Sequence, residues 1–218
     1  MASRPPQPER LTLEGPAGAL QVLLETPLGA GVAAPRAFGV VCHPHPLQGG
    51  TMDNKVVWTV ARAFQQLGAP TFRFNFRGVG ASAGSYDEGR GETADALAVV
   101  DYGRQRFPTA ALWLGGFSFG GVIAIRAAAA AHPARLVAVA PGINRVDVAG
   151  VPAPDCPWLI VQGDADDVVP PQAVLEWARA LSPAPTLRLL PGAGHFFHGR
   201  INELRDVVLD FMGSTPGG

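Results

Sequence analysis

The sequence predicts an α/β protein in which helices flank a mostly parallel central sheet. Short runs of β-branched or aromatic residues alternate along the chain with longer amphipathic or alanine-rich segments, and glycine-rich turns separate the two kinds of segment. Several of the short runs are almost wholly apolar, as strands buried on both faces of a parallel sheet must be. Together these observations favour an α/β fold built around one sheet.

The expected elements follow from hydrophobic period and run length. We expect strands over residues 20–25, 37–42, 71–76, 111–115, 136–140, 158–163 and 186–190. We expect helices over residues 54–67, 92–107, 118–131, 171–181 and 200–212. In the last of these, Ile201, Leu204, Val208 and Phe211 recur at the spacing of one helix face.

A chain of 218 residues, 47% of them hydrophobic, is long enough for one well-buried core and too short for two large ones. We therefore expect a single domain over residues 11–212. Residues 1–10, which are proline-rich and polar, and residues 213–218 are expected to be flexible tails.

Charge and composition favour a small-molecule partner. The net charge is −1 and the basic residues form no runs, which argues against nucleic acid or a membrane surface as partner. Cys42 and Cys156 form no CxxC pair, so neither a disulfide framework nor a zinc knuckle is expected. The first ten residues lack the apolar stretch of a secretory signal, and we expect a cytoplasmic protein with no membrane span. The sequence leaves a homodimer open, because it does not show how the sheet edges are covered.

The strongest chemical signal is the segment Gly116-Phe117-Ser118-Phe119-Gly120, which lies between an apolar strand and an apolar helix. That context predicts a nucleophile elbow, a tight strand-to-helix turn that raises a serine above the sheet. Glycines two residues before and after the serine remove side chains that would collide with neighbouring elements. The start of the following helix offers free N–H groups to an oxyanion. Ser118 is therefore the candidate nucleophile.

A serine hydroxyl needs a base and an orienting acid, and this motif predicts them in the chain order Ser, Asp, His. His195 follows the strand expected at 186–190, and the aspartates 164, 166 and 167 follow the strand at 158–163. Both positions are at the carboxyl ends of strands, where open α/β sheets gather their sites. We choose Asp166, because two or three residues after Gly163 are needed to turn a side chain back over the sheet edge. Asp164 remains the alternative.

Six segments of the chain together resemble a bacterial family of small, lidless α/β-hydrolases whose substrates are mostly unassigned. The segments are 43–46 (HPHP), 49–57 (GGTMDNKVV), 73–80 (RFNFRGVG), 116–120 (GFSFG), 163–166 (GDAD) and 195–198 (HFFH). The resemblance runs from about residue 38 to residue 211. Carried over by position, it implies the α/β-hydrolase fold without a lid domain, and a triad of Ser118, Asp166 and His195.

The loop from His43 to Gly50 stands where α/β-hydrolases supply the second donor of the oxyanion hole. Pro44 has no N–H to give. We therefore expect the backbone N–H groups of His45 and Phe119 to form the oxyanion hole. A competing interpretation makes His43, His45 and Asp53 a zinc site, but the oxyanion loop explains the same residues and no further ligand cluster is evident. We expect neither a metal nor a cofactor.

These residues predict a serine hydrolase, of carboxylesterase or thioesterase type, that cleaves a small acyl ester or related carbonyl substrate through an acyl-enzyme. Phe117, Phe196 and Phe197 are candidates for an apolar acyl pocket. Only 17 residues, 141–157, separate two expected strands at the position where larger hydrolases insert a lid, so the cleft should be shallow. The alternative is an inactive α/β scaffold that binds a ligand or a protein.

Overall fold

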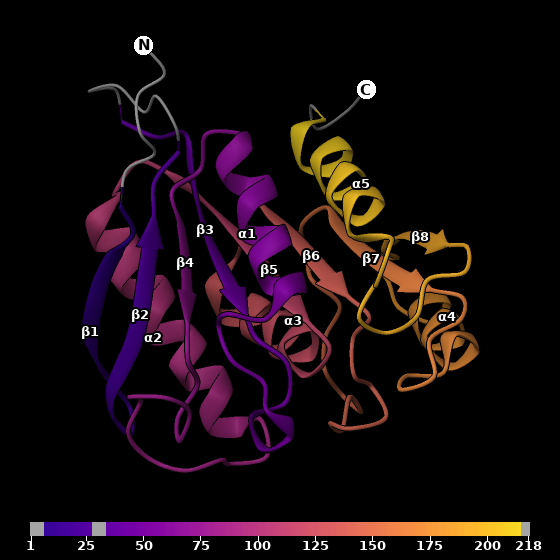
Figure 1. Ribbon diagram of the computed structural model, residues 1–218, viewed down its shortest axis with the longest axis horizontal. Helices are drawn as coiled ribbons and strands as arrows, with labels where there is room; N and C mark the ends of the chain where they lie inside the picture. Colours follow the sequence, from indigo (N-terminus) through magenta and orange to yellow (C-terminus); the bar gives the residue numbers. More distant parts are fainter. Residues whose placement is uncertain (1–6, 28–33, 215–218) are drawn as a thin grey trace.

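The computed structural model describes residues 7–27 and 34–214, and it has an eight-stranded sheet with helices on both faces (Figure 1). The strand order is β1-β2-β4-β3-β5-β6-β7-β8. β1 and β2 are antiparallel to each other, β2 is antiparallel to β4, and the remaining neighbours are parallel. The strands are β1 (Glu9–Gly15), β2 (Gly18–Glu25), β3 (Ala37–Cys42), β4 (Thr71–Phe74), β5 (Ala111–Phe117), β6 (Arg135–Val139), β7 (Trp158–Gly163) and β8 (Thr186–Leu190). The predicted α/β fold with a mostly parallel sheet is confirmed.

Helices divide between the two faces of the sheet. They are α1 (Lys55–Gln66), α2 (Arg90–Arg106), α3 (Phe119–Ala131), α4 (Pro171–Arg179) and α5 (Ile201–Gly213), with a short 3₁₀ helix η1 (Pro46–Gln48) after β3. α1 and α5 lie side by side on one face, and α2 and α3 lie together on the other (Figure 1). α4 packs into the same core as α2 and α3. The three-layer arrangement leaves one core on each side of the sheet.

Side chains of β3 point alternately into the two cores. Phe38, Val40 and Cys42 belong to the core under α2 and α3, whereas Ala37 and Val41 belong to the core under α1 and α5. All of these side chains are buried, because β3 is a central strand covered on both faces. This explains why the strand is an uninterrupted apolar run in the sequence.

Most predicted elements are present with small changes at their ends. The strands at 37–42, 158–163 and 186–190 are confirmed with the predicted bounds. α1 begins one residue after Asn54, because the Asn54 side chain caps the helix by accepting the N–H of Val56 at 2.9 Å. β4 ends at Phe74 rather than at residue 76, and β5 runs on to Phe117.

The predicted N-terminal tail, residues 1–10, is wrong at its end. β1 begins at Glu9 and pairs with β2 in register from Glu9 opposite Leu24 to Gly15 opposite Gly18. Residues 9 and 10 therefore belong to the sheet, and residues 1–6 lie outside the described part. At the other end α5 includes Gly213, so the predicted tail 213–218 also overlaps an element, and 215–218 are outside the described residues.

The strand order has a topological switch point near the centre of the sheet. The chain passes from β3 to β4 in one direction and then crosses back to β5 on the other side of β3. At such a switch point the loops after two neighbouring strands diverge to opposite faces, and open α/β proteins bind ligands there. The loop after β3 carries His43 and His45, and the turn after β5 carries Ser118. Between β6 and β7, residues 140–157 contain neither a helix nor a strand.

Candidate active site

Ser118 occupies a strained turn between the end of β5 and the start of α3. Its φ is 55° and its ψ is −120°, a backbone conformation that residues other than glycine rarely adopt. The Ser118 N–H donates to the carbonyl of Val139 at 2.9 Å, and the Ser118 carbonyl accepts the N–H groups of Gly121 and Gly142, each at 2.9 Å. These bonds on both sides of the residue hold the strained conformation in place.

The two glycines of the elbow are required by close backbone packing. A Cβ on Gly116 would overlap the carbonyl of Gly120, and a Cβ on Gly120 would overlap the carbonyl oxygens of Cys42 and His43. Any side chain at Gly120 would therefore push α3 away from the loop after β3. The glycines of the segment 116–120 are thus required by the structure of the turn, and the motif is not a coincidence of a glycine-rich sequence.

His195 lies against the Ser118 hydroxyl. Its Nε2 is 3.1 Å from Ser118 Oγ, and its Nδ1 is 2.8 Å from Asp166 Oδ2. The imidazole is buried against the Phe117 ring, with 4.9 Å between ring centroids. The structure therefore brings three distant residues together. In the chain, His195 is 77 positions from Ser118 and 29 positions from Asp166.

Asp166 is held as a carboxylate behind the imidazole. Its Oδ1 accepts the N–H groups of Val168 and Val169 at 2.9 and 2.8 Å, while Oδ2 accepts from Gln162 Nε2 as well as facing His195. Burial by itself would raise the pKa of Asp166. The hydrogen bonds from His195 and from the two backbone N–H groups outweigh it, so the pKa lies below its usual value. The ionised acid can stabilise a charged imidazole.

The alternative acid, Asp164, has a different partner. Its Oδ1 accepts the N–H of Gly192 at 2.6 Å, which ties β7 to the turn that precedes His195. A second bond between the same segments joins the Ala165 N–H to the Ala193 carbonyl at 3.1 Å. Asp166 faces the imidazole, and Asp164 fixes the loop that carries it. Sequence reasoning missed Gln162, whose amide donates to Asp166 from within β7; a lone polar residue in an apolar strand was the available signal.

The N–H groups of His45 and Phe119 are both free to bind a ligand. Phe119 is the first residue of α3, and among the described residues neither its N–H nor that of His45 donates a hydrogen bond within the chain. The rings of these two residues contact each other, with centroids 5.1 Å apart. Gly142 packs directly on the peptide between Ser118 and Phe119, where a Cβ would approach Phe119 N to 3.2 Å. Free backbone donors of this kind can bind a developing oxyanion.

The residues of the competing zinc interpretation have other partners. His43 Nε2 accepts the N–H of Phe76 at 3.0 Å and its Nδ1 lies 2.6 Å from the Pro44 carbonyl, so both ring nitrogens are used. His45 Nδ1 accepts the Leu47 N–H. Asp53 pairs with Arg73. Nowhere in the described part of the chain do three or more His, Cys, Asp or Glu side chains gather in a way that could hold a metal ion.

The bonding of His43 requires the neutral ring, and this predicts a pH dependence of stability. Burial lowers the pKa of His43 from 6.5 to about 4, against the opposing effect of its bond to the Pro44 carbonyl. As the pH falls, the unfolded chain takes up a proton on His43 before the folded protein does. The contribution of His43 to the free energy of unfolding is therefore fully present above pH 6.5 and is lost as the pH drops from about 6.5 towards 4. The loss should reach roughly 3 kcal/mol.

We expect the free energy of unfolding of the wild type, measured by urea denaturation, to decrease more steeply between pH 7 and 4.5 than that of His43→Gln. The variant keeps a side-chain acceptor but has no group that titrates in this range. Parallel curves for the two proteins would show that His43 is protonated equally in the folded and unfolded states.

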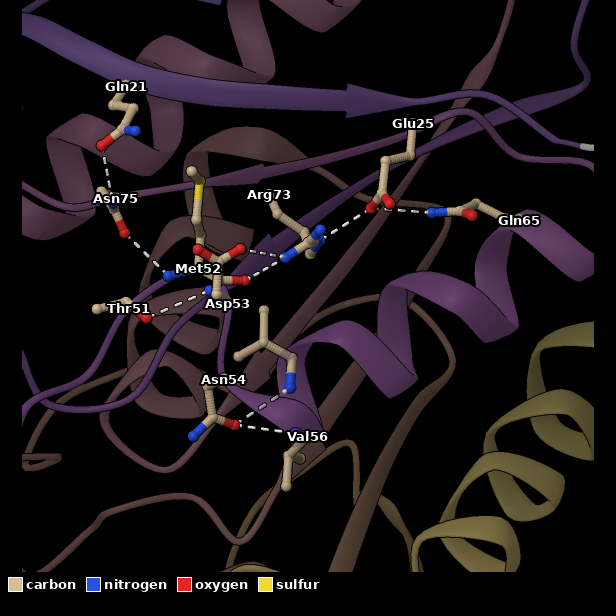
Figure 2. A network of polar contacts seen from close by, with 11 residues as sticks. Gln21, Glu25, Thr51, Met52, Asp53, Asn54, Val56, Gln65, Arg73 and Asn75 are labelled. Carbon is tan, nitrogen blue, oxygen red and sulfur yellow. Dashed lines mark hydrogen bonds and ion pairs between the residues drawn. The ribbon is translucent and has the colours of Figure 1, made fainter. Parts of the chain in front are cut away.

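A polar network fixes the segment that follows the loop 43–50 (Figure 2). The Met52 N–H donates to Asn75 Oδ1 at 2.9 Å, and the Met52 carbonyl accepts from Arg73 Nη1 at 2.5 Å. Arg73 also bonds Glu25 at 2.9 Å and Asp53 at 3.3 Å, while Asn75 donates to Gln21 at 2.8 Å. Two side chains of the segment 73–80 therefore hold the backbone of the segment 49–57. The segments 49–57 and 73–80 are thereby joined into one hydrogen-bonded unit.

The predicted aromatic pocket is wrong for two of its three residues. Phe117 and Phe197 are fully buried and belong to the core under α1 and α5, because β5 extends to Phe117 and the turn after His195 folds inward. Phe196 is 46% exposed and lies with its ring centroid 5.1 Å from that of His195. Of these three residues, only Phe196 is exposed beside the site.

Comparison with known proteins agrees with this fold. Residues 47–146 match the family model described as alpha/beta hydrolase fold. An α/β serine hydrolase without a lid, from Xanthomonas campestris, is 44% identical, with a TM-score of 0.90 over 98% of this chain and 99% of that one. An α/β serine hydrolase homologue from Coxiella burnetii is 43% identical, with a TM-score of 0.87 over 93% and 96% of the two chains. A protein of Rickettsia prowazekii (strain Madrid E) is 33% identical over 185 residues, 80% of this chain and 78% of its own.

Fold and matched model thus place the chain in the class of α/β-hydrolases. Within that class, it belongs to the family of small, lidless α/β-hydrolases. This fold supports hydrolase activity. In the segments 7–27 and 34–214, no helix combines the length and apolar character needed to cross a bilayer.

Proposed function

We propose that the protein is a serine hydrolase that cleaves small acyl esters or thioesters through an acyl-enzyme on Ser118. One observation carries the proposal: the hydroxyl of a strained elbow serine lies 3.1 Å from an imidazole whose other nitrogen lies 2.8 Å from a buried carboxylate. A hydroxyl is a weak nucleophile near neutral pH, and this chain of bonds supplies the base that activates it.

In the proposed reaction, Ser118 Oγ attacks the acyl carbonyl while His195 Nε2 takes its proton. Asp166 accepts the Nδ1–H of His195, which leaves Nε2 free as the base and stabilises the imidazolium that forms. The N–H groups of His45 and Phe119 bind the oxyanion, and each such donor contributes about 3 to 4 kcal/mol in comparable enzymes. His195 then protonates the leaving group. Water, activated in the same way, releases the acid from Ser118.

The stretch between β6 and β7 favours short or partly exposed acyl groups. Residues 140–157 contain no helix that could cover the site, and Phe196 lies exposed at its rim. A long acyl chain would therefore leave much of its apolar surface in water. We expect activity towards p-nitrophenyl esters to be highest for short acyl chains.

The proposal is tested by reaction with a fluorophosphonate, which forms a covalent adduct only with an activated serine. We expect one adduct per chain, located at Ser118 by peptide mass spectrometry, and none in Ser118→Ala. Ser85→Ala, which removes an exposed serine of the loop after β4, is the matched control and should label like the wild type. An unlabelled, folded wild type would instead favour the inactive binding scaffold.

A further inference from the structure

A cavity of about 580 Å³ lies between the segment before α2, the middle of α3 and the stretch after β6, and it carries an excess of positive charge. Three arginines and two carboxylates line it, together with Tyr86 and Val146. The charged residues are Glu88, Arg90, Arg126, Arg145 and Asp147. Neither the elbow nor the hydrogen-bonded chain of Ser118, His195 and Asp166 accounts for a group of cations at this place.

One lining residue of the cavity, Tyr86, contacts the two residues of the proposed oxyanion hole. The Tyr86 ring packs on the rings of His45 and Phe119, with centroids 5.0 and 5.9 Å apart. The N–H groups of Arg145 and Val146 donate to the Gly142 carbonyl at 2.9 and 3.2 Å, and Gly142 itself bonds to the Ser118 carbonyl. Arg126 lies about two turns along α3 from Ser118, and long side chains on a helix point back towards its N-terminus.

Within the described part of the chain, two of the arginines form no ion pair with a carboxylate. Among the described residues Arg145 has no side-chain hydrogen bond or ion pair, and Arg126 donates to the backbone carbonyl of Asp147 at 2.5 Å. Arg90 differs, because it pairs with Asp87 at 3.1 Å and with Glu88 at 3.7 Å. Burial and the nearby Arg145 charge both lower the pKa of His45, which places Arg145 within electrostatic range of the oxyanion loop.

His195 and the cavity residue Tyr86 contact opposite chain neighbours of Ser118. His195 contacts Phe117, which belongs to the core under α1 and α5, whereas Tyr86 contacts Phe119, which belongs to the core under α2 and α3. His195 must protonate the leaving group, so the leaving group lies on its side of the serine. The acyl group then extends towards Tyr86 and the arginines.

We infer that this cavity is an acyl subsite for a substrate whose acyl group ends in an anion, a carboxylate or a phosphate, bound by Arg126 and Arg145. The inference rests on the proposed serine hydrolase function and names its substrate class. Guanidinium groups bind both anions through paired N–H donors, and the net positive charge of the cavity attracts either. Neutral acyl esters should still react, because the cations lie away from the scissile bond.

The test compares kcat/KM for three p-nitrophenyl esters of equal chain length, the neutral hexanoate, the monoester of adipate, and the phosphonopentanoate. We expect the wild type to prefer an anionic ester over hexanoate by about tenfold or more. Which anionic ester reacts faster identifies carboxylate or phosphate as the natural group. The preference should weaken as salt is raised.

Arg145→Gln should lower kcat/KM for the anionic esters by about tenfold more than it lowers kcat/KM for hexanoate, since its side chain has no ion pair within the described structure. Arg126→Gln should act in the same direction. Arg179→Gln, an exposed arginine at the end of α4 and outside the cavity, removes the same charge and should change neither ester.

Hydrolysis of hexanoate with no preference for either anion would overturn this inference and leave the hydrolase proposal intact. So would a preference that persists in Arg145→Gln and Arg126→Gln. If no ester of the three reacts and Ser118 is not labelled, the hydrolase proposal fails and this inference fails with it.

Discussion

Asp166→Asn is expected to lower kcat on a short p-nitrophenyl ester by about 10⁴-fold while the protein stays folded. Asp166 Oδ2 lies 2.8 Å from His195 Nδ1, and an ionised acid there keeps the proton on Nδ1. An amide nitrogen in its place would favour the tautomer with the proton on Nε2, which cannot accept the proton of Ser118. The substitution therefore stops His195 from acting as a base, although the side chain at position 166 keeps its size.

The surroundings of Asp166 explain why the variant should fold. Its Oδ1 accepts the N–H groups of Val168 and Val169, and the asparagine oxygen can keep both bonds. The new amide nitrogen would face Gln162 Nε2, which now donates to Oδ2 at 2.9 Å. Gln162 Oε1 is buried and has no partner among the described residues, so rotation of the Gln162 amide would offer it as an acceptor. Unfolding in urea should show a loss of about 1 kcal/mol or less.

Asp164→Asn is the matched control for this prediction. Asp164 bonds the Gly192 N–H through Oδ1, which an asparagine oxygen can replace, and its side chain is exposed to solvent. We expect kcat to stay within about threefold of the wild type, since the imidazole keeps its carboxylate. If instead Asp164→Asn were inactive and Asp166→Asn active, the two aspartates would have exchanged roles.

The positions of the proposed nucleophile and base were predictable because each follows a strong local pattern. Ser118 stands between an apolar strand and an apolar helix, and His195 follows a strand late in the chain. The choice between Asp164 and Asp166 could not be settled from the residues alone, because both lie within three positions of the end of β7. What separates them is which backbone N–H groups each oxygen meets after the loop folds, and the sequence does not encode those contacts in any local pattern.

Other differences have equally specific causes. β1 was missed because an exposed edge strand with Glu9, Arg10 and Glu14 has little of the apolar character that marks a buried strand. The sequence cannot show whether Phe117 and Phe197 line a pocket, because aromatic residues near a site can line it or support it, and only burial distinguishes the two. Arg73 looked like a motif residue, and its ion pair with Glu25 depends on β2 lying beside β4.

Arg73→Met is expected to cost about 3 to 5 kcal/mol of unfolding free energy. Arg73 is 5% exposed and Glu25 is 16% exposed, so removing one partner leaves a largely buried carboxylate without its cation. Gln65, which donates to the same Glu25 oxygen at 3.3 Å, cannot replace a charge. The variant also frees the Met52 carbonyl, so the segment after the oxyanion loop loses one of its two anchors (Figure 2).

Two further variants separate this mechanism from a general loss of charge. Arg205→Met removes an arginine that pairs with Asp206 at 2.8 Å on the exposed surface of α5, and it should cost less than about 1 kcal/mol. The double variant Arg73→Met, Glu25→Gln removes the orphaned carboxylate, so urea denaturation should show it less destabilised than the sum of the two single changes. Additive losses would mean that Arg73 stabilises the fold mainly through its bond to Met52, and a loss below 1 kcal/mol for Arg73→Met would contradict both explanations.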